Sequence, residues 1–189
     1  MMYRLDVAPR RGTVLNGVLF RQGEQRANDT VMIAITGIHG NFYSNPFYVN
    51  IGDTLSAAGF DFVYAQTADA FPRIETVNVR THEREVVGSW NERFSNTDED
   101  IDAYLGFAEG QGYGHIVLAG HSLGANKVVH YLSHHHDPRV DHFFLLSPAN
   151  LTHMMSGVTD RERDAILDQV RRGDGDKMLP FPSWAGWSA

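Results

Sequence analysis

The sequence has no cysteine among its 189 residues, which excludes a disulfide framework, thiolate catalysis and any zinc site with sulfur ligands. It is also short of positive charge, because 16 lysines and arginines face 23 aspartates and glutamates and leave a formal net charge of −7. A general nucleic-acid-binding protein needs a basic face that neutralises phosphates. We therefore expect no nucleic-acid partner.

Long hydrophobic runs are also missing. No apolar run approaches the roughly 18 residues that a membrane span requires, and the first residues lack the apolar stretch of a signal peptide. We therefore expect no membrane partner and a cytoplasmic location. Apolar residues nevertheless make up 42% of the chain, which is enough for one sizeable core, and the length suits one domain.

Short apolar runs bounded by turn residues predict six strands. They cover residues 3–7, 13–20, 31–36, 60–65, 115–119 and 141–147. Helical patterns cover residues 46–58, 97–109 and 123–135. This alternation predicts an α/β fold with a mostly parallel sheet that is covered on both faces. Residues 66–96 show no long apolar period, and we expect them to form a long loop that leaves the sheet.

The strongest functional signal is Gly120-His121-Ser122-Leu123-Gly124, placed between a predicted strand and a predicted helix. A serine on a sharp strand-to-helix turn needs small neighbours, and the two glycines meet that need. The turn also directs the Leu123 amide and the helix N-terminus at the reacting centre, where they stabilise a developing oxyanion. The alternative is a glycine-rich turn with a capping serine. The strand-turn-helix context favours Ser122 as a catalytic nucleophile.

A second feature follows the predicted strand 31–36, which runs directly into Gly37-Ile38-His39-Gly40-Asn41. Together with the serine motif downstream, this order resembles the α/β-hydrolase superfamily, and Gly-His-Ser-Leu-Gly is similar to the motif of many of its lipases and esterases. The resemblance implies that the first loop supplies one oxyanion-hole amide, from Ile38 or alternatively from His39, and that Leu123 supplies the second. A simple turn after a strand is the other interpretation of His39-Gly40.

The resemblance covers about residues 1–150, where the six predicted strands correspond to the first six strands of the family's core. In this superfamily the catalytic acid follows the seventh strand and the histidine follows the eighth. Residues 151–189 show no further apolar strand, and the last histidine is His153. We therefore expect an α/β-hydrolase core at residues 1–150 that lacks the seventh and eighth strands, followed at 151–189 by the start of a cap or lid segment.

Two explanations of the missing base and acid stay open. Either the chain is truncated, or the fold is complete and a substitute base such as His39 or His153 serves. An apolar edge strand at 142–147 and an aromatic segment at 180–187 favour truncation, because natural proteins cover such surfaces. His121 and Asn150 complete the set of residues that we expect near the pocket.

The predicted function is nucleophilic acyl transfer to water, from a carboxylic ester or thioester. It implies a small-molecule acyl substrate and no cofactor. Since a serine without a base attacks esters poorly, we expect this chain to be impaired. The alternative is a non-catalytic, hydrolase-like module that binds a partner or forms a homodimer through the exposed edge strand or the aromatic C-terminal end.

Two further clusters receive a structural interpretation. His130 and His134 share a helix face and precede His135 and His136, so this helix end could chelate zinc. No carboxylate pattern of the H-E-x-x-H kind accompanies them, and we expect a solvated helix end without a physiological metal. The mixed charges around Trp90 could recognise an anionic or aromatic substrate group, although such a segment is usually solvated.

Overall fold

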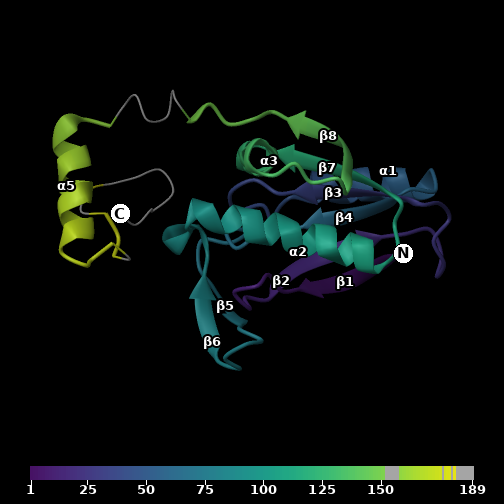
Figure 1. Ribbon diagram of the computed structural model, residues 1–189, viewed down its shortest axis with the longest axis horizontal. Coiled ribbons are helices and arrows are strands. Elements are labelled where there is room, and N and C mark those ends of the chain that lie inside the picture. The colour runs from purple at the N-terminus through teal and green to yellow at the C-terminus, as the bar shows by residue number, and fades with distance from the viewer. Residues whose placement is uncertain (152–157, 176, 180, 182–189) are drawn as a thin grey trace.

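The computed structural model describes residues 1–151, 158–175, 177–179 and 181. A six-stranded sheet with the order β1-β2-β4-β3-β7-β8 forms its centre (Figure 1). Its strands are β1 (Met2–Val7), β2 (Leu15–Phe20), β3 (Thr30–Ile35), β4 (Asp61–Ala65), β7 (His115–His121) and β8 (Val140–Leu146). β2 pairs antiparallel with β1 and β4, whereas β4, β3, β7 and β8 run parallel. The prediction of an α/β fold with a mostly parallel sheet is confirmed.

All six predicted strands are present, with ends that differ by one or two residues from the apolar runs in the sequence. β1 and β2 form a hairpin whose turn is closed by the Gly12 amide, which donates to the Pro9 carbonyl at 2.8 Å. Gly12 has a φ of 95°, a conformation that glycine adopts at little cost. Turn chemistry therefore fixes the first pairing of the sheet.

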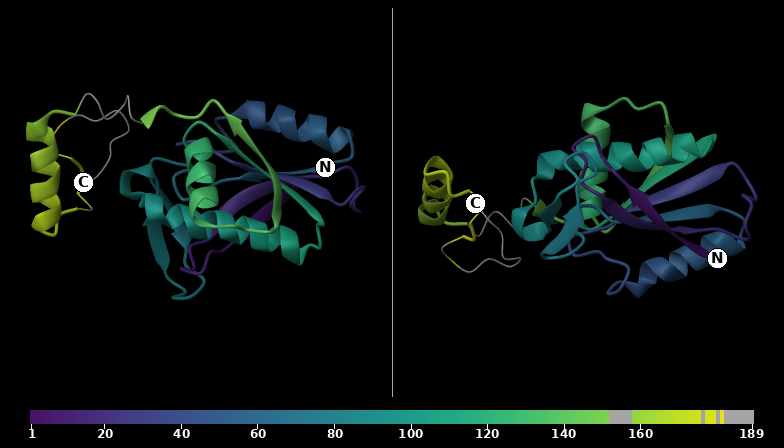
Figure 2. Two further views of the ribbon diagram at one scale, coloured as in Figure 1. Left: turned by 45° about the horizontal axis from the view of Figure 1, so that its top comes forward. Right: turned by 90° about the horizontal axis from the view of Figure 1, so that it is seen from below.

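Helices cover both faces of the sheet (Figure 2), with α1 (Pro46–Ala57) on the opposite side from α2 (Thr97–Gly110) and α3 (Leu123–His134). Because successive side chains of a strand point to opposite faces of the sheet, β3 contributes side chains to the hydrophobic cores on both faces. Val31, Ile33 and Ile35 belong to the core that packs on α2, whereas Ala34 packs with Tyr48 of α1. The sheet is thereby fixed from both sides, and the loops at the carboxyl ends of its parallel strands have a rigid base.

The segment 66–96 differs from the expected loop. It contains a hairpin of β5 (Ile74–Val77) and β6 (Arg84–Val87), followed by two short 3-10 helices, η1 (Ser89–Asn91) and η2 (Phe94–Asn96). The Val14 amide donates to the Val77 carbonyl at 3.0 Å and ties the hairpin to the start of β2. The segment therefore leaves the main sheet, as expected, but it is not a plain loop, because strands of four residues are too short to produce a period in the sequence.

β8 forms one edge of the sheet, and the side chains of Phe143 and Phe144 are more than half exposed. The polar helix α5 (Asp160–Arg171) lies apart from the sheet in Figure 1 and begins with a capping box between Thr159 and Glu162. His153 lies outside the described residues, and so does the predicted aromatic segment 180–187 except for Phe181. The division into a core and a cap segment stays a prediction. In the described part of the chain, no helix has the length and apolarity that crossing a membrane requires.

Candidate active site

Ser122 occupies the single-residue turn between β7 and α3. Its φ of 53° and ψ of −125° lie in a region that non-glycine residues rarely adopt, at a cost of about 1–3 kcal/mol. The flanking glycines make the turn possible, because a Cβ on Gly120 would lie 2.4 Å from the Gly124 carbonyl oxygen. The Ser122 amide donates to the Leu146 carbonyl of β8 at 2.9 Å. The strained turn is thus held in place by its neighbours.

The loop after β3 lies directly against this serine. A Cβ on Gly37 would lie 2.9 Å from the Ser122 Cβ and 3.4 Å from its Oγ. A Cβ on Gly124 would lie 2.3 Å from the Ile35 carbonyl oxygen, so the start of α3 also presses on the end of β3. These close approaches explain why both loops need glycine, and they bring residues 37–40 and 122–124 to one place.

The backbone amides near Ser122 differ in whether they are available to a substrate. The His39 amide donates to the Asp69 carbonyl at 3.0 Å, so this amide is already used. The Ile38 amide donates to no acceptor in the described part of the chain, and Leu123 is the first residue of α3, where amides have no acceptor within the helix. Of the two alternatives in the loop after β3, Ile38 is therefore the one that could contribute to an oxyanion hole.

The histidines near Ser122 make other contacts. His39 Nε2 forms a hydrogen bond of 2.6 Å with Ser89 Oγ, and His121 Nδ1 forms one of 2.9 Å with the Tyr48 hydroxyl. Burial lowers the pKa of His121. Among the described residues, no histidine or carboxylate hydrogen-bonds to Ser122 Oγ. The expected pocket residue Asn150 is exposed, and His153 lies outside the described residues.

A buried ionic cluster on the helix that follows this turn was not predicted from the sequence. Lys127, on α3, contacts Asp69 and Glu92, and its side chain is 1% exposed. Burial alone would lower the pKa of Lys127, but the attraction of the two carboxylates outweighs it and the pKa is raised. Burial raises the pKa of Glu92 to about 7, although Lys127 opposes the shift. A sequence signal existed, because position 127 falls within the buried stripe of α3 that includes Gly124 and Tyr131.

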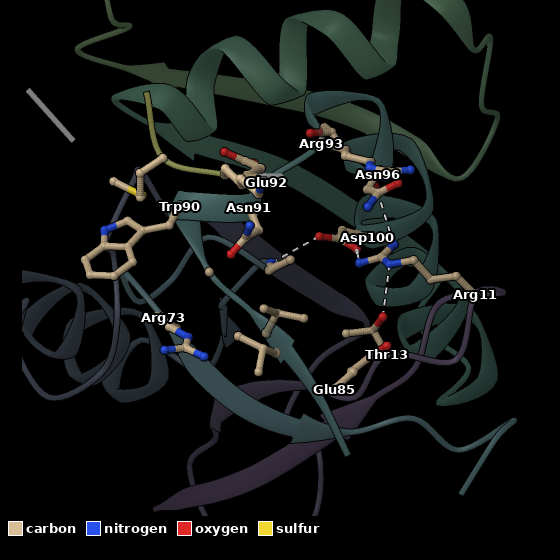
Figure 3. Close-up of a pocket in the computed structure, with 17 residues that line it drawn as sticks. Arg11, Thr13, Arg73, Glu85, Trp90, Asn91, Glu92, Arg93, Asn96 and Asp100 are labelled. Carbon is tan, nitrogen blue, oxygen red and sulfur yellow. Dashed lines mark hydrogen bonds and ion pairs between the residues drawn. The ribbon is translucent and has the colours of Figure 1, made fainter. Parts of the chain in front are cut away.

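Glu92 also lines a cavity of about 920 Å³ (Figure 3). Trp90 and Arg73 lie at one end of it, and Arg11 with Asp100 at the other. None of residues 37–40 or 120–124 lines it. The cavity is therefore separate from the serine. The candidate site is placed instead by the close packing of Gly37 against Ser122.

The histidine-rich end of α3 has a carboxylate neighbour that the sequence did not reveal. His130 Nε2 lies 3.6 Å and His135 Nε2 3.3 Å from the carboxylate of Asp98 on α2. His134 Nδ1 hydrogen-bonds to the His130 carbonyl. Within the described residues, no group of three such side chains has the arrangement of a metal site. These contacts join the end of α3 to the start of α2.

Comparisons with known proteins agree on the fold. No family model and no curated protein matches the chain. The α/β hydrolase GrgF from Penicillium sp. sh18 matches with a TM-score of 0.63 and 16% identity, over 98% of this chain and 60% of its own. Est1E from Butyrivibrio proteoclasticus matches with a TM-score of 0.61 and 18% identity, over 82% of this chain and 55% of its own. An esterase domain from a Rhodothermus marinus protein matches with a TM-score of 0.53 and 17% identity, over 77% of this chain and 49% of its own. The chain spans about half the length of such structures.

Proposed function

We propose that this chain, which has the α/β-hydrolase fold, is a serine hydrolase that transfers the acyl group of a carboxylic ester or thioester to water through Ser122. One observation supports this most directly: Ser122 occupies a strained strand-to-helix turn, and Gly37 of the loop after β3 lies against it. A plain capping serine would need neither the strain nor the close approach. The strand order of the sheet and the esterase-like solved structures support the same reaction class.

The residues have distinct roles in the proposed reaction. Ser122 Oγ attacks the carbonyl carbon, and the carbonyl oxygen, as it becomes negative, accepts hydrogen bonds from the Ile38 and Leu123 amides. The bond to the leaving alcohol or thiol then breaks as that group takes up the proton lost by Ser122, and water attacks the acyl-serine, which releases the carboxylic acid and restores the Ser122 hydroxyl. The hydroxyl proton needs a base. Since no described histidine hydrogen-bonds to Ser122 Oγ, we expect the 189-residue chain to react slowly.

Labelling with a fluorophosphonate probe tests the nucleophile without requiring full turnover. We expect a mass shift on the peptide that contains Ser122 and its loss in Ser122→Ala. Ser133→Ala is the matched control, because Ser133 is an exposed hydroxyl on α3, the helix that begins directly after Ser122. Failure of the correctly folded wild-type chain to label, or undiminished labelling of Ser122→Ala, would overturn the assignment.

A second candidate function is self-association through β8, supported by the exposure of that strand. Phe143, Phe144, Leu145 and Leu146 are all more than one third exposed, so both faces of an edge strand present apolar side chains. Two copies could pair these edges antiparallel about a two-fold axis. Light scattering should then show a dimer that Phe144→Lys dissociates and that Val129→Lys, at an exposed apolar position on α3, does not. A wild-type monomer at high concentration would exclude this role.

A further inference from the structure

Lys127 connects α3, the helix that follows Ser122, with two segments of the stretch 66–96. It lies on α3, five residues after the serine, and its Nζ is 2.8 Å from Asp69 Oδ1 and 2.5 Å from Glu92 Oε1. It also donates to Thr67 Oγ1 at 3.2 Å. A buried ammonium is tolerated only when such partners replace water. These contacts therefore hold the segments that provide them in fixed positions relative to α3.

The first of these segments holds the loop after β3 through main-chain groups. The Asp69 carbonyl accepts a hydrogen bond from the His39 amide at 3.0 Å, and the Ala70 carbonyl accepts one from Asn41 Nδ2 at 3.1 Å. Asn41 Nδ2 also donates to the His39 carbonyl at 3.0 Å. The residue whose carboxylate contacts Lys127 thus fixes His39 with its own backbone.

The second segment reaches the same histidine from a different part of the chain. Glu92 follows η1 directly, and Ser89 of η1 hydrogen-bonds to His39 Nε2 at 2.6 Å. The two carboxylates on Lys127 therefore belong to segments that both contact His39, one at its amide and one at its ring. This convergence involves residues 69, 89 and 92, which are far apart from 39 and 127 in the sequence.

We propose that Lys127 is a positioning residue, which fixes His39 through Asp69 and through the Ser89–Glu92 segment and so holds the neighbouring Ile38 amide in place relative to Ser122. The inference rests on the proposed function, because it gives Ile38 the role of an oxyanion donor. Asp69 is the essential link, since its carbonyl makes the main-chain bond. Glu92 is the secondary link, and protonation of its carboxylate leaves the contact between Lys127 and Asp69 intact.

The test compares Lys127→Met with Lys177→Met in the full chain, because these are the chain's two lysines and the side chain of Lys177 is 74% exposed. We expect amide hydrogen exchange at His39 to be at least tenfold faster in K127M, while Ile33 in the middle of β3 keeps its rate. A purely structural role would instead accelerate exchange throughout the sheet, in proportion to the lost stability. K177M should leave both rates unchanged.

The second readout is the reactivity of Ser122. We expect fluorophosphonate labelling of K127M, corrected for the folded fraction, to be at least tenfold slower. With p-nitrophenyl acetate, kcat should fall while KM stays the same, since an oxyanion donor acts in the transition state. If K127M does not fold, the neutral triple variant K127M/D69N/E92Q, which leaves no unpaired buried charge in the cluster, takes its place with the same expectations.

The two proposals fail in different ways. A wild-type chain that never labels, together with faster His39 exchange in the variant, would refute the serine hydrolase and leave the mechanical link from Lys127 to the loop intact. A wild-type chain that labels, together with a folded variant whose His39 exchange and labelling rate are unchanged, would refute the role of Lys127 alone.

Discussion

Replacing Glu92 with glutamine should stabilise the protein at pH 8 and make its stability less dependent on pH. The Glu92 side chain is 15% exposed, and its carboxylate shares one ammonium with the fully buried Asp69. Burial raises the pKa of Glu92 from 4.5 to about 7, against the attraction of Lys127. The folded protein therefore binds a proton at Glu92 in a pH range where the unfolded chain has already lost it.

The sign and size of the effect follow from this difference in pKa. Between pH 4.5 and 7 the folded state binds more protons than the unfolded state, so the contribution of Glu92 to stability falls as the pH rises. It is fully present below about pH 4.5 and lost above about pH 7. A difference of 2.5 pKa units corresponds to about 3 kcal/mol at roughly 1.4 kcal/mol per unit.

Urea unfolding of the wild type and Glu92→Gln at pH 4.5 and pH 8 measures this quantity. We expect the stability of E92Q relative to the wild type to rise by about 3 kcal/mol between the two pH values. Glu109→Gln removes a carboxylate that is 67% exposed and should show little change, and all other titrating groups are common to the three proteins. A relative stability that does not change with pH, or that falls for E92Q at pH 8, would show that attraction to Lys127 outweighs the cost of burial.

Three further substitutions test the fold and the site. Arg21→Met should lower the free energy of unfolding in urea by about 3–5 kcal/mol, because Asp61 loses its buried cationic partner; a loss below 1 kcal/mol would contradict this. Gly37→Ala should destabilise the protein by about 1–3 kcal/mol and slow the labelling of Ser122, since its Cβ would lie 2.9 Å from the serine Cβ; unchanged labelling would argue against the close approach. Ser122→Gly should be more stable than Ser122→Ala by about 1 kcal/mol in thermal unfolding, because glycine relieves the strained φ; equal stability would mean that there is no strain.

The main elements of the fold could be predicted because their signals are local. Each strand of the six-stranded sheet is a short apolar run, and two glycines within five residues indicate the turn at Ser122. The hairpin β5–β6 left no such signal, because its four-residue strands are mostly exposed and carry charged residues between the apolar ones. Its position depends on the contact with β2, which the sequence of the segment does not contain.

The ionic cluster around Lys127 could not be predicted for a related reason. The period of α3 places a lysine in the buried stripe, which the sequence alone could have flagged as unusual. Its partners Asp69 and Glu92 lie 58 and 35 positions away, and nothing in either neighbourhood points to Lys127. Long-range pairing of charges therefore had to come from the structure, as did the fact that the His39 amide is already used by Asp69.

Backbone strain at residues other than Ser122 adds to the argument for the position of the site. Four described residues other than glycine have a positive φ, and three of them, His39, Ser122 and Ser147, follow the carboxyl ends of β3, β7 and β8. These strands are neighbours in the sheet, so the strained residues lie together at the carboxyl ends of the parallel strands. Strain of this kind persists only where surrounding contacts enforce it. Open α/β sheets bind their ligands just outside the carboxyl ends of their strands. Since the fourth residue, His82, lies in the turn of the outlying hairpin, the strain within the six-stranded body concentrates where the reaction is proposed to occur.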